Sequence, residues 1–243
     1  MAVGVELVEQ GLGLTYDGQP LALLDDLTVT LWGEHHTLAR GGLEGREPTT
    51  AAREDALGPH TLWHRVYTTQ SLCHAASFEL HLRLYAKLAV LELVPVGVGP
   101  VWGQEELASL RIGQLPDCRR GLFVHQRVTE YGRDAVGAWW AQASWLPDPT
   151  RHNRWDWGLF AAARRDDGLA LAVVPLTGAG AVSRLRGDDP GLSVVASGGF
   201  GRQSYARLPL AVLAVGDQVS DAIDSAMGAA ITLSDGRLLA RGD

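Results

Sequence analysis

A cluster of tryptophans with polar neighbours is the part of the chain whose residue types best suit ligand binding. Five of the eight tryptophans fall between residues 139 and 157. The apolar faces of sugars stack on aromatic rings, while acidic, amide and imidazole groups at the rim bind the hydroxyls. The sequence therefore predicts these sugar-binding residues: Trp139, Trp140, Asp148, His152 and Trp155. Tryptophans also anchor sandwich cores, so packing remains the alternative role for each of them.

The histidines offer fragments of a metal site without a full ligand set. His35 and His36 are adjacent, and no third ligand follows at a recognisable spacing, which favours a solvated turn. His60 and His64 have the i, i+4 spacing of a helical ligand pair, whereas the local pattern is that of a strand. We therefore predict neither a bound metal nor a cofactor.

Acidic residues occur as consecutive pairs, and these are expected to form turns. Glycoside cleavage needs two carboxyl groups that face each other across one bond, and consecutive residues rarely do so. The pairs are Asp25–Asp26, Glu105–Glu106, Asp166–Asp167 and Asp188–Asp189. The sequence also lacks GxSxG, HExxH, CxxC and a GxGxxG that opens a helix. We predict no catalytic residue in this chain.

The elements that must position these residues are mostly strands. Between Phe78 and Tyr85, apolar Phe78 and every second residue after it point one way, and Glu79, His81, Arg83 and Tyr85 point the other way. Further strands are expected at 3–8, 21–31, 61–70, 89–96, 122–128, 138–145, 158–163, 169–176, 181–187, 191–198 and 208–215. About a dozen strands are typical of a large antiparallel sandwich or barrel.

One amphipathic helix is predicted near the end of the sequence, over residues 220–231. Ile223, Met227 and Ile231 repeat at the spacing of one helical face, and Ser220 can cap its first turn. The polar, turn-rich segment 41–60 is expected to be a long surface loop. These elements place a sandwich domain in residues 1–231 and a linker in residues 232–243.

Composition and charge exclude several classes of partner. The net charge is −7 and the basic residues are scattered, which argues against binding to nucleic acid. The most apolar stretch, 88–98, is too short to span a bilayer and contains Glu92. The start of the sequence has no signal-peptide pattern, and the two cysteines, Cys73 and Cys118, are more consistent with separate thiols than with a disulfide scaffold. We therefore expect a cytoplasmic protein with no membrane partner.

The order of several motifs resembles the N-terminal domain of glycoside hydrolase family 36, in the group of raffinose synthases and seed-imbibition-type α-galactosidases. The motifs are WW (139–140), WGLFAAARRDDGLALAVVPL (157–176), RLRG (184–187), LSVVASG (192–198) and LAVGDQVSDAIDSAMGAA (213–230). The resemblance covers about 110 residues, from Gly121 to Ile231. Ala196 stands where the family has an acidic residue, Val219 replaces a proline, and the family's Glu-Thr-Gln before Trp157 is missing.

This resemblance implies a mainly β fold: a large antiparallel, galactose-mutarotase-like β-supersandwich followed by one C-terminal helix. In the family, an aspartate nucleophile and an aspartate acid/base lie in a following (β/α)₈ barrel, so no catalytic residue is carried over to this chain. The implied partner is such a barrel, in the same polypeptide or encoded next to it. Trp139 and Trp140 would then lie at the rim of its galactoside site or at an oligomer contact.

Two other functions remain open at this point. The Trp-rich region is consistent with a stand-alone carbohydrate-binding module. An aldose epimerase-like enzyme would need a histidine acid and a glutamate base that converge in one cleft. His125 and Glu130 lie near each other in the sequence, but nothing in the sequence shows that their side chains face one another.

Overall fold

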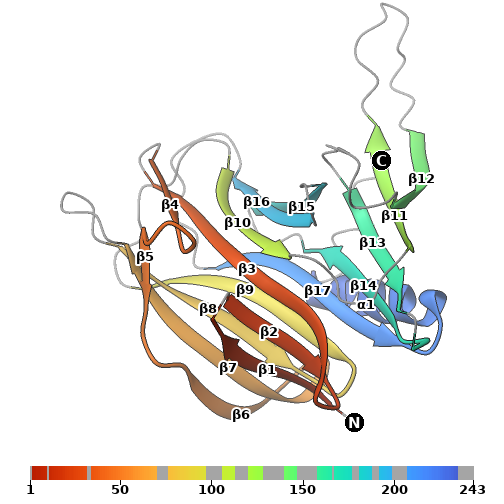
Figure 1. Ribbon diagram of the computed structural model, residues 1–243, viewed down its shortest axis with the longest axis horizontal. Coiled ribbons are helices and arrows are strands. Elements are labelled where there is room, and N and C mark those ends of the chain that lie inside the picture. Colours follow the sequence, from red (N-terminus) through yellow and green to blue (C-terminus); the bar gives the residue numbers. More distant parts are fainter. Residues whose placement is uncertain are drawn as a thin grey trace, which may run out of the picture.

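The computed structural model describes most of the chain, and its strands are connected in one continuous antiparallel network. The described residues are 2–9, 11–31, 34–69, 76–96, 106–112, 120–127, 140–146, 158–165, 167–176, 181–187, 192–198 and 207–234. In these ranges, hydrogen bonds join 17 strands, and one helix follows them. The predicted fold class, a mainly antiparallel β-supersandwich with one C-terminal helix, is confirmed (Figure 1).

The strands form two layers that share one apolar core. The elements are β1 (Val3–Val8), β2 (Gly11–Tyr16), β3 (Gln19–Leu31), β4 (Glu34–Thr37), β5 (Leu43–Gly45), β6 (Thr49–Asp55), β7 (Gly58–Thr69), β8 (Ser77–Leu84), β9 (Leu88–Val96), β10 (Glu106–Ile112), β11 (Arg120–Arg127), β12 (Trp140–Leu146), β13 (Gly158–Arg164), β14 (Ala170–Pro175), β15 (Ala181–Gly187), β16 (Leu192–Gly198), β17 (Leu208–Gly216) and α1 (Val219–Leu233).

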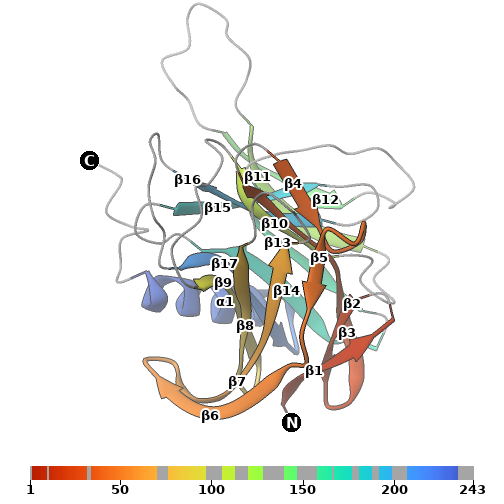
Figure 2. The same cartoon turned by 90° about the vertical axis from the view of Figure 1, so that its left-hand side faces the viewer.

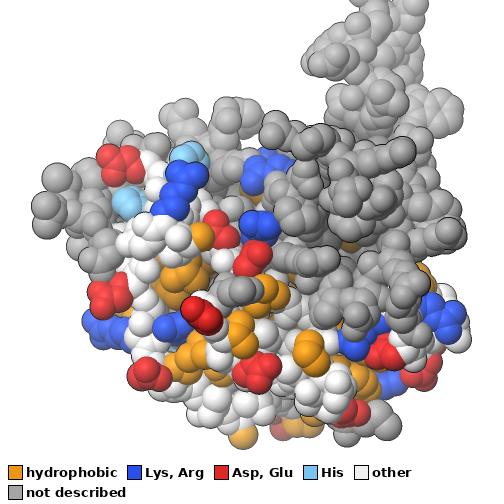
Figure 3. Space-filling model, viewed as in Figure 1, with side chains coloured by type: hydrophobic (Ala, Val, Ile, Leu, Met, Phe, Trp, Pro, Cys, Tyr) orange, Lys and Arg blue, Asp and Glu red, His pale blue; other side chains and the backbone are white. Residues whose placement is uncertain are grey.

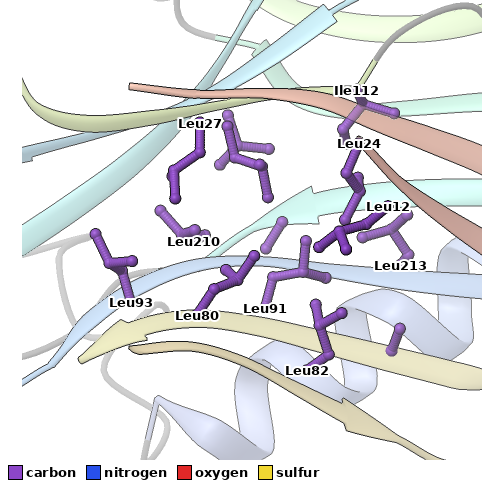
Figure 4. Packing of buried hydrophobic residues seen from close by; sticks show 14 of the residues in the cluster. Leu12, Leu24, Leu27, Leu80, Leu82, Leu91, Leu93, Ile112, Leu210 and Leu213 are labelled. Atoms are coloured by element: carbon purple, nitrogen blue, oxygen red, sulfur yellow. The ribbon is translucent and has the colours of Figure 1, made fainter. Parts of the chain in front are cut away.

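We call the two layers sheet A and sheet B. Sheet A runs in the order β1-β2-β3-β10-β16-β15, with β4 paired to the end of β3. Sheet B runs β6-β7-β8-β9-β17-β14-β13-β11-β12, with β5 paired to the far end of β7. In the described ranges, the pair Gly158 with Leu185 joins the two sheets. The leucine-rich core lies between them (Figure 4).

Helix α1 covers only part of the outer face of sheet B. It packs on β17, β14 and β13 through small residues, namely Ala222, Ala226, Ala229 and Ala230. In Figure 2 the helix lies on one side of β17 and β14, while β1 and β3 lie on the other side. Strands β14 and β17 are therefore buried on both faces, which explains their nearly continuous apolar sequences.

Strand β8 lies beyond the reach of the helix and keeps one polar face. Its burial alternates at every residue from Ser77 to Leu84, as the sequence predicted. Phe78, Leu80 and Leu82 are fully buried in the core, so the residues between them point away from it. Because the helix does not extend over β6 to β9, their outer surface is uncovered and carries polar side chains.

Several local predictions were wrong, and each has a physical reason. Segment 41–60 is no long loop: β5, β6 and the start of β7 lie within it, and β6 and β7 form a hairpin. Strand β6 is an edge strand with mostly exposed residues, so it carries no apolar alternation. Its two-residue turn ends at Gly58, whose φ of 105° suits glycine.

The histidine and acidic pairs near the N-terminus were also misplaced. His35 and His36 lie in strand β4, not in a turn, and His36 is buried. Asp25 and Asp26 lie inside β3, where Asp26 accepts a hydrogen bond from the Ala39 N–H. The two aspartates lie in the middle of this long strand, where its register with β10 shifts between Leu24 and Asp26, so a polar pair does not mark a turn here.

The helix was located correctly, but its first residue and its cap were not. It begins at Val219 after Gln218, and no side chain caps it, so Ser220 is a helical residue and not the cap. Its buried face is centred on the alanines, while Ile223, Met227 and Ile231 are partly buried beside them. Among the described residues, no helix is long and apolar enough to cross a bilayer.

Charges are mixed on the outer face of sheet A. Figure 3 shows acidic, basic and apolar side chains interspersed over β1, β2 and β3. This agrees with the scattered basic residues of the sequence. Polar side chains that bond to one another are concentrated on the outer face of sheet B.

Candidate functional site

A group of ionisable side chains lies together on the outer face of sheet B, and we call it the polar face. It consists of Asp55 at the end of β6, His60 and His64 on β7, Glu79, His81 and Arg83 on β8, and Glu92 on β9. The strand register brings these residues together. His64 is paired directly with His81 across β7 and β8, and His81 is paired directly with Glu92 across β8 and β9. Residues opposite each other in an antiparallel pair have Cβ atoms only about 5 Å apart.

Arg83 holds two carboxylates from strands on either side of it. Its Nη1 donates to Asp55 Oδ2 at 2.6 Å, and its Nη2 donates to Glu92 Oε1 at 2.7 Å. All three side chains are largely shielded from solvent, with 13%, 22% and 10% exposure for Arg83, Asp55 and Glu92. Arg207, which is 61% exposed, adds a longer contact of 3.4 Å to Glu92 Oε2. The guanidinium of Arg83 is thus the main cation for two buried charges.

The same network fixes the protonation of its members. Burial raises the pKa of Asp55, but hydrogen bonds from Tyr85 and Arg83 outweigh this and hold it below the ordinary value. Burial also opposes the charge on Arg83, yet Glu92 and Asp55 raise its pKa further. Burial and the bond to Asp55 raise the pKa of the Tyr85 hydroxyl well above its ordinary value. Asp55 is therefore ionised and Tyr85 protonated at neutral pH.

A second cluster, made of His64, Glu79 and His81, lies beside this network. His81 Nε2 donates to Glu79 Oε2 at 2.6 Å, and His64 Nδ1 lies 3.8 Å from the same oxygen. The three ligand atoms are all within 4.8 Å of one another. The two rings meet edge to face, with their centroids 5.5 Å apart.

The second nitrogen of His64 is held from outside the cluster. His64 Nε2 and the Thr49 hydroxyl are 2.5 Å apart, and Thr49 is the direct partner of His64 across β6 and β7. His64 Nδ1 is shielded from solvent and makes no hydrogen bond within the described part of the chain. The ring is therefore oriented with Nδ1 toward Glu79.

The predicted sugar-binding residues are not tested by the structure. Trp140 begins strand β12, and Trp139, Asp148, His152 and Trp155 lie outside the described residues. His125 lies on β11 opposite Gln142, while Glu130 also lies outside the described residues, as do Cys73 and Cys118. None of the residues of the polar face is among the five predicted sugar-binding residues.

The sequence pattern placed three of the seven residues of the polar face together, without identifying them as a site. The alternation in β8 placed Glu79, His81 and Arg83 on one face. His64 was missed because its pairing with His60 was rejected, although residues four apart on a strand lie on the same face, as these two do on β7. Its true neighbour is His81, seventeen residues later, and only the register of β7 and β8 brings the two together.

Comparisons with known proteins point to a fold and to no sequence family. No protein-family model matches the chain, and no curated protein sequence matches it. Solved structures do match. The α-N-acetylgalactosaminidase NagBb from Bifidobacterium bifidum aligns over 96% of this chain at 15% identity with a TM-score of 0.57 in its Gal-NHAc-DNJ complex. Its GalNAc complex aligns at 14% identity with a TM-score of 0.55. The chain shares the fold of this part of NagBb.

The chain spans only 38% of the length of NagBb. A protein from Escherichia coli K12 assigned as an aldose 1-epimerase also aligns, over 88% of this chain, with 11% identity and a TM-score of 0.46. A likeness at that score does not establish a shared fold. The comparison with NagBb supports the two-layered β architecture that the strand pairing shows.

Proposed function

We propose that this chain is a non-catalytic β-sandwich domain of a carbohydrate-active protein of the glycoside hydrolase family 36 type. In this proposal it packs on a catalytic (β/α)₈ barrel, in the same polypeptide or encoded next to it. The observation that carries the proposal is the unequal coverage of the match to NagBb. The alignment takes in 96% of this chain but 38% of the α-N-acetylgalactosaminidase, so the fold matches one portion of a longer glycosidase.

The motif order supports the same proposal independently. The segments that resemble the family 36 N-terminal domain correspond to β13, β14, β17 and α1 in the helix-covered part of sheet B, and to β15 and β16 in sheet A. In the proposal, Trp139 and Trp140 lie at the rim of a galactoside site of the barrel or at an oligomer contact. The loops of a rigid sandwich are suited to such a role.

The charges of the polar face also favour a supporting role over glycoside hydrolysis. Hydrolysis needs two carboxyl groups placed on opposite sides of a substrate bond. Asp55 and Glu92 are both held by Arg83, and Glu79 is held by His81. Within the described ranges, the carboxylates of this face are thus engaged by cations or by an imidazole.

Assays on the 243-residue chain test the non-catalytic part of the proposal. With aryl α-galactosides and aryl α-N-acetylgalactosaminides as substrates, we expect no hydrolysis above the buffer rate. With freshly dissolved galactose, polarimetry should show interconversion of the anomers at the buffer rate. Hydrolysis or accelerated anomer conversion that persists in a preparation of a single species would overturn the proposal.

A fluorescence titration separates the domain from a stand-alone sugar-binding module. Galactose, melibiose or raffinose is added to the isolated chain, and tryptophan emission is recorded. A saturable change that is lost in the Trp155→Ala variant would favour the binding module. We expect no saturable change, because the proposed sugar site needs the barrel.

A further inference from the structure

We propose that His64, Glu79 and His81 form a binding site for one Zn²⁺ ion on the outer face of sheet B. The inference concerns a different chemistry from the proposed domain function and does not depend on it. Its basis is the geometry of three ligand atoms from two adjacent strands, together with His64 Nδ1, which has no hydrogen-bond partner among the described residues.

The separations of the ligand atoms fit a single small cation. Zinc bonds to imidazole nitrogen and carboxylate oxygen are about 2.0 to 2.2 Å long, so tetrahedral ligands lie about 3.3 Å from each other. Glu79 Oε2 is 2.6 Å from His81 Nε2 and 3.8 Å from His64 Nδ1, values on either side of that distance. The strand register fixes the positions of the Cβ atoms, and small rotations of the side chains can bring the ligand atoms to the distances that zinc requires.

His64 already has the orientation of a metal ligand. A ligating histidine ordinarily binds the metal with one ring nitrogen and a neighbouring polar group with the other. The Thr49 hydroxyl holds His64 Nε2, and Nδ1 is shielded yet unbonded within the described residues. A shielded nitrogen without a partner destabilises the fold, and a bound cation would remove that cost.

The ligand types select zinc over the common oxygen-seeking cations. Two imidazoles and one carboxylate suit Zn²⁺, whereas Mg²⁺ and Ca²⁺ prefer sites made only of oxygen atoms. Three protein ligands leave the fourth tetrahedral position to water. Water can reach the edge of the cluster, because the side chains of His64 and Glu79 are 29% and 28% exposed, while the His64 Nδ1 atom itself is shielded.

The competing arrangement is an ion pair without a metal. Protonated His81 would remain bonded to Glu79, as the 2.6 Å contact allows, and His64 would not be needed for the ion pair. The two arrangements differ in one measurable respect. Zinc binding requires both histidines, whereas the ion pair involves His81 alone.

Calorimetric titration of the isolated chain with ZnCl₂ at pH 7.5 tests the proposal, with MgCl₂ as the comparison ion. We expect saturable zinc binding and no binding of magnesium at the same concentrations. His64→Gln, Glu79→Gln and His81→Gln should each weaken zinc binding more than about tenfold, and Thr49→Val should weaken it about tenfold by releasing the His64 ring. His35→Gln is the matched control, because His35 is an exposed strand histidine outside the cluster, and it should leave the affinity unchanged.

Zinc that binds elsewhere, for example at the cysteines, contributes equally in all variants and so does not alter the comparison. Circular dichroism confirms that each variant is folded. A second readout needs no variant: the imidazole nitrogen signals of two histidines should shift together in NMR spectra as zinc is added. The proposal is overturned if the wild-type chain binds no zinc, or if His64→Gln and His81→Gln bind it as tightly as the wild type.

Discussion

The Tyr85 hydroxyl donates a hydrogen bond of 2.6 Å to the Asp55 carboxylate. This contact joins the residue after β8 to the last residue of the edge strand β6, thirty positions earlier in the chain. Tyr85 is buried in the apolar cluster that also contains the alanines of α1, and it lies in the turn between β8 and β9. The bond therefore joins the β6–β7 hairpin to the turn between β8 and β9.

Replacing Tyr85 by phenylalanine removes this bond and little else. Asp55 keeps Arg83 and the Leu57 N–H as donors, so we expect a loss of about 1 to 2 kcal/mol in the free energy of unfolding. Urea unfolding of the wild type, Tyr85→Phe, Asp55→Asn and the double variant measures the coupling. The two single effects should not add; strict additivity would show that the bond contributes nothing.

Stability should fall in acid because of Asp55. Its pKa is lower in the folded than in the unfolded chain, so the unfolded state binds more protons below about pH 5. The stabilisation is thus complete above the ordinary value of 3.8 and is lost as the pH falls through the folded pKa. The free energy of unfolding, measured from pH 6 to pH 3, should decline more steeply in the wild type than in Asp55→Asn. Parallel curves would contradict this assignment.

Arg83 should matter far more than Arg207, although both contact Glu92. Arg83→Met leaves two shielded carboxylates without their main cation, and we expect a loss of about 3 kcal/mol or more. Arg207→Gln is the matched control, since an exposed partner at 3.4 Å contributes less than about 0.5 kcal/mol. Chemical denaturation of both variants provides the comparison. Equal effects would mean that Arg83 is not the central cation of the network.

The sequence predicted the parts of the fold whose residues repeat with a period. The alternation of β8, the apolar runs of β14 and β17, and the helix were all found in this way. The edge strand β6 was missed because seven mostly exposed residues carry no such period. Strand β2 was missed because Gly11 and Gly13, which alternate with the buried Leu12 and Leu14, have a low propensity for strands.

The site was less predictable than the fold because it depends on register. His64 and Glu79 lie fifteen positions apart in the sequence, and a shift of one residue between β7 and β8 would place them on opposite faces of the sheet. Register follows from the packing of the whole core. Single-residue reasoning on β7 could therefore not identify the neighbours of His64.

Two glycines near the helix should respond to alanine in opposite directions. Gly228 lies in α1 with open space where a Cβ would be, so Gly228→Ala should stabilise the domain by about 0.5 to 1 kcal/mol. At Gly216, the last residue of β17, a Cβ would lie 2.8 Å from the Ala222 nitrogen. Gly216→Ala should therefore destabilise it. Thermal melting of both variants tests the packing of α1 on sheet B, and a gain for both would contradict it.

The central claim is that the chain supports glycosidase chemistry performed by another domain. The most direct test is to isolate, with an antibody against the chain, the form in which its host produces it, and to measure hydrolysis of aryl α-galactosides and α-N-acetylgalactosaminides. We predict that this form hydrolyses one of them and carries a (β/α)₈ barrel, identified by mass spectrometry, while the 243-residue chain hydrolyses neither. A host form that contains the chain alone, with no hydrolysis of either substrate, would contradict the account.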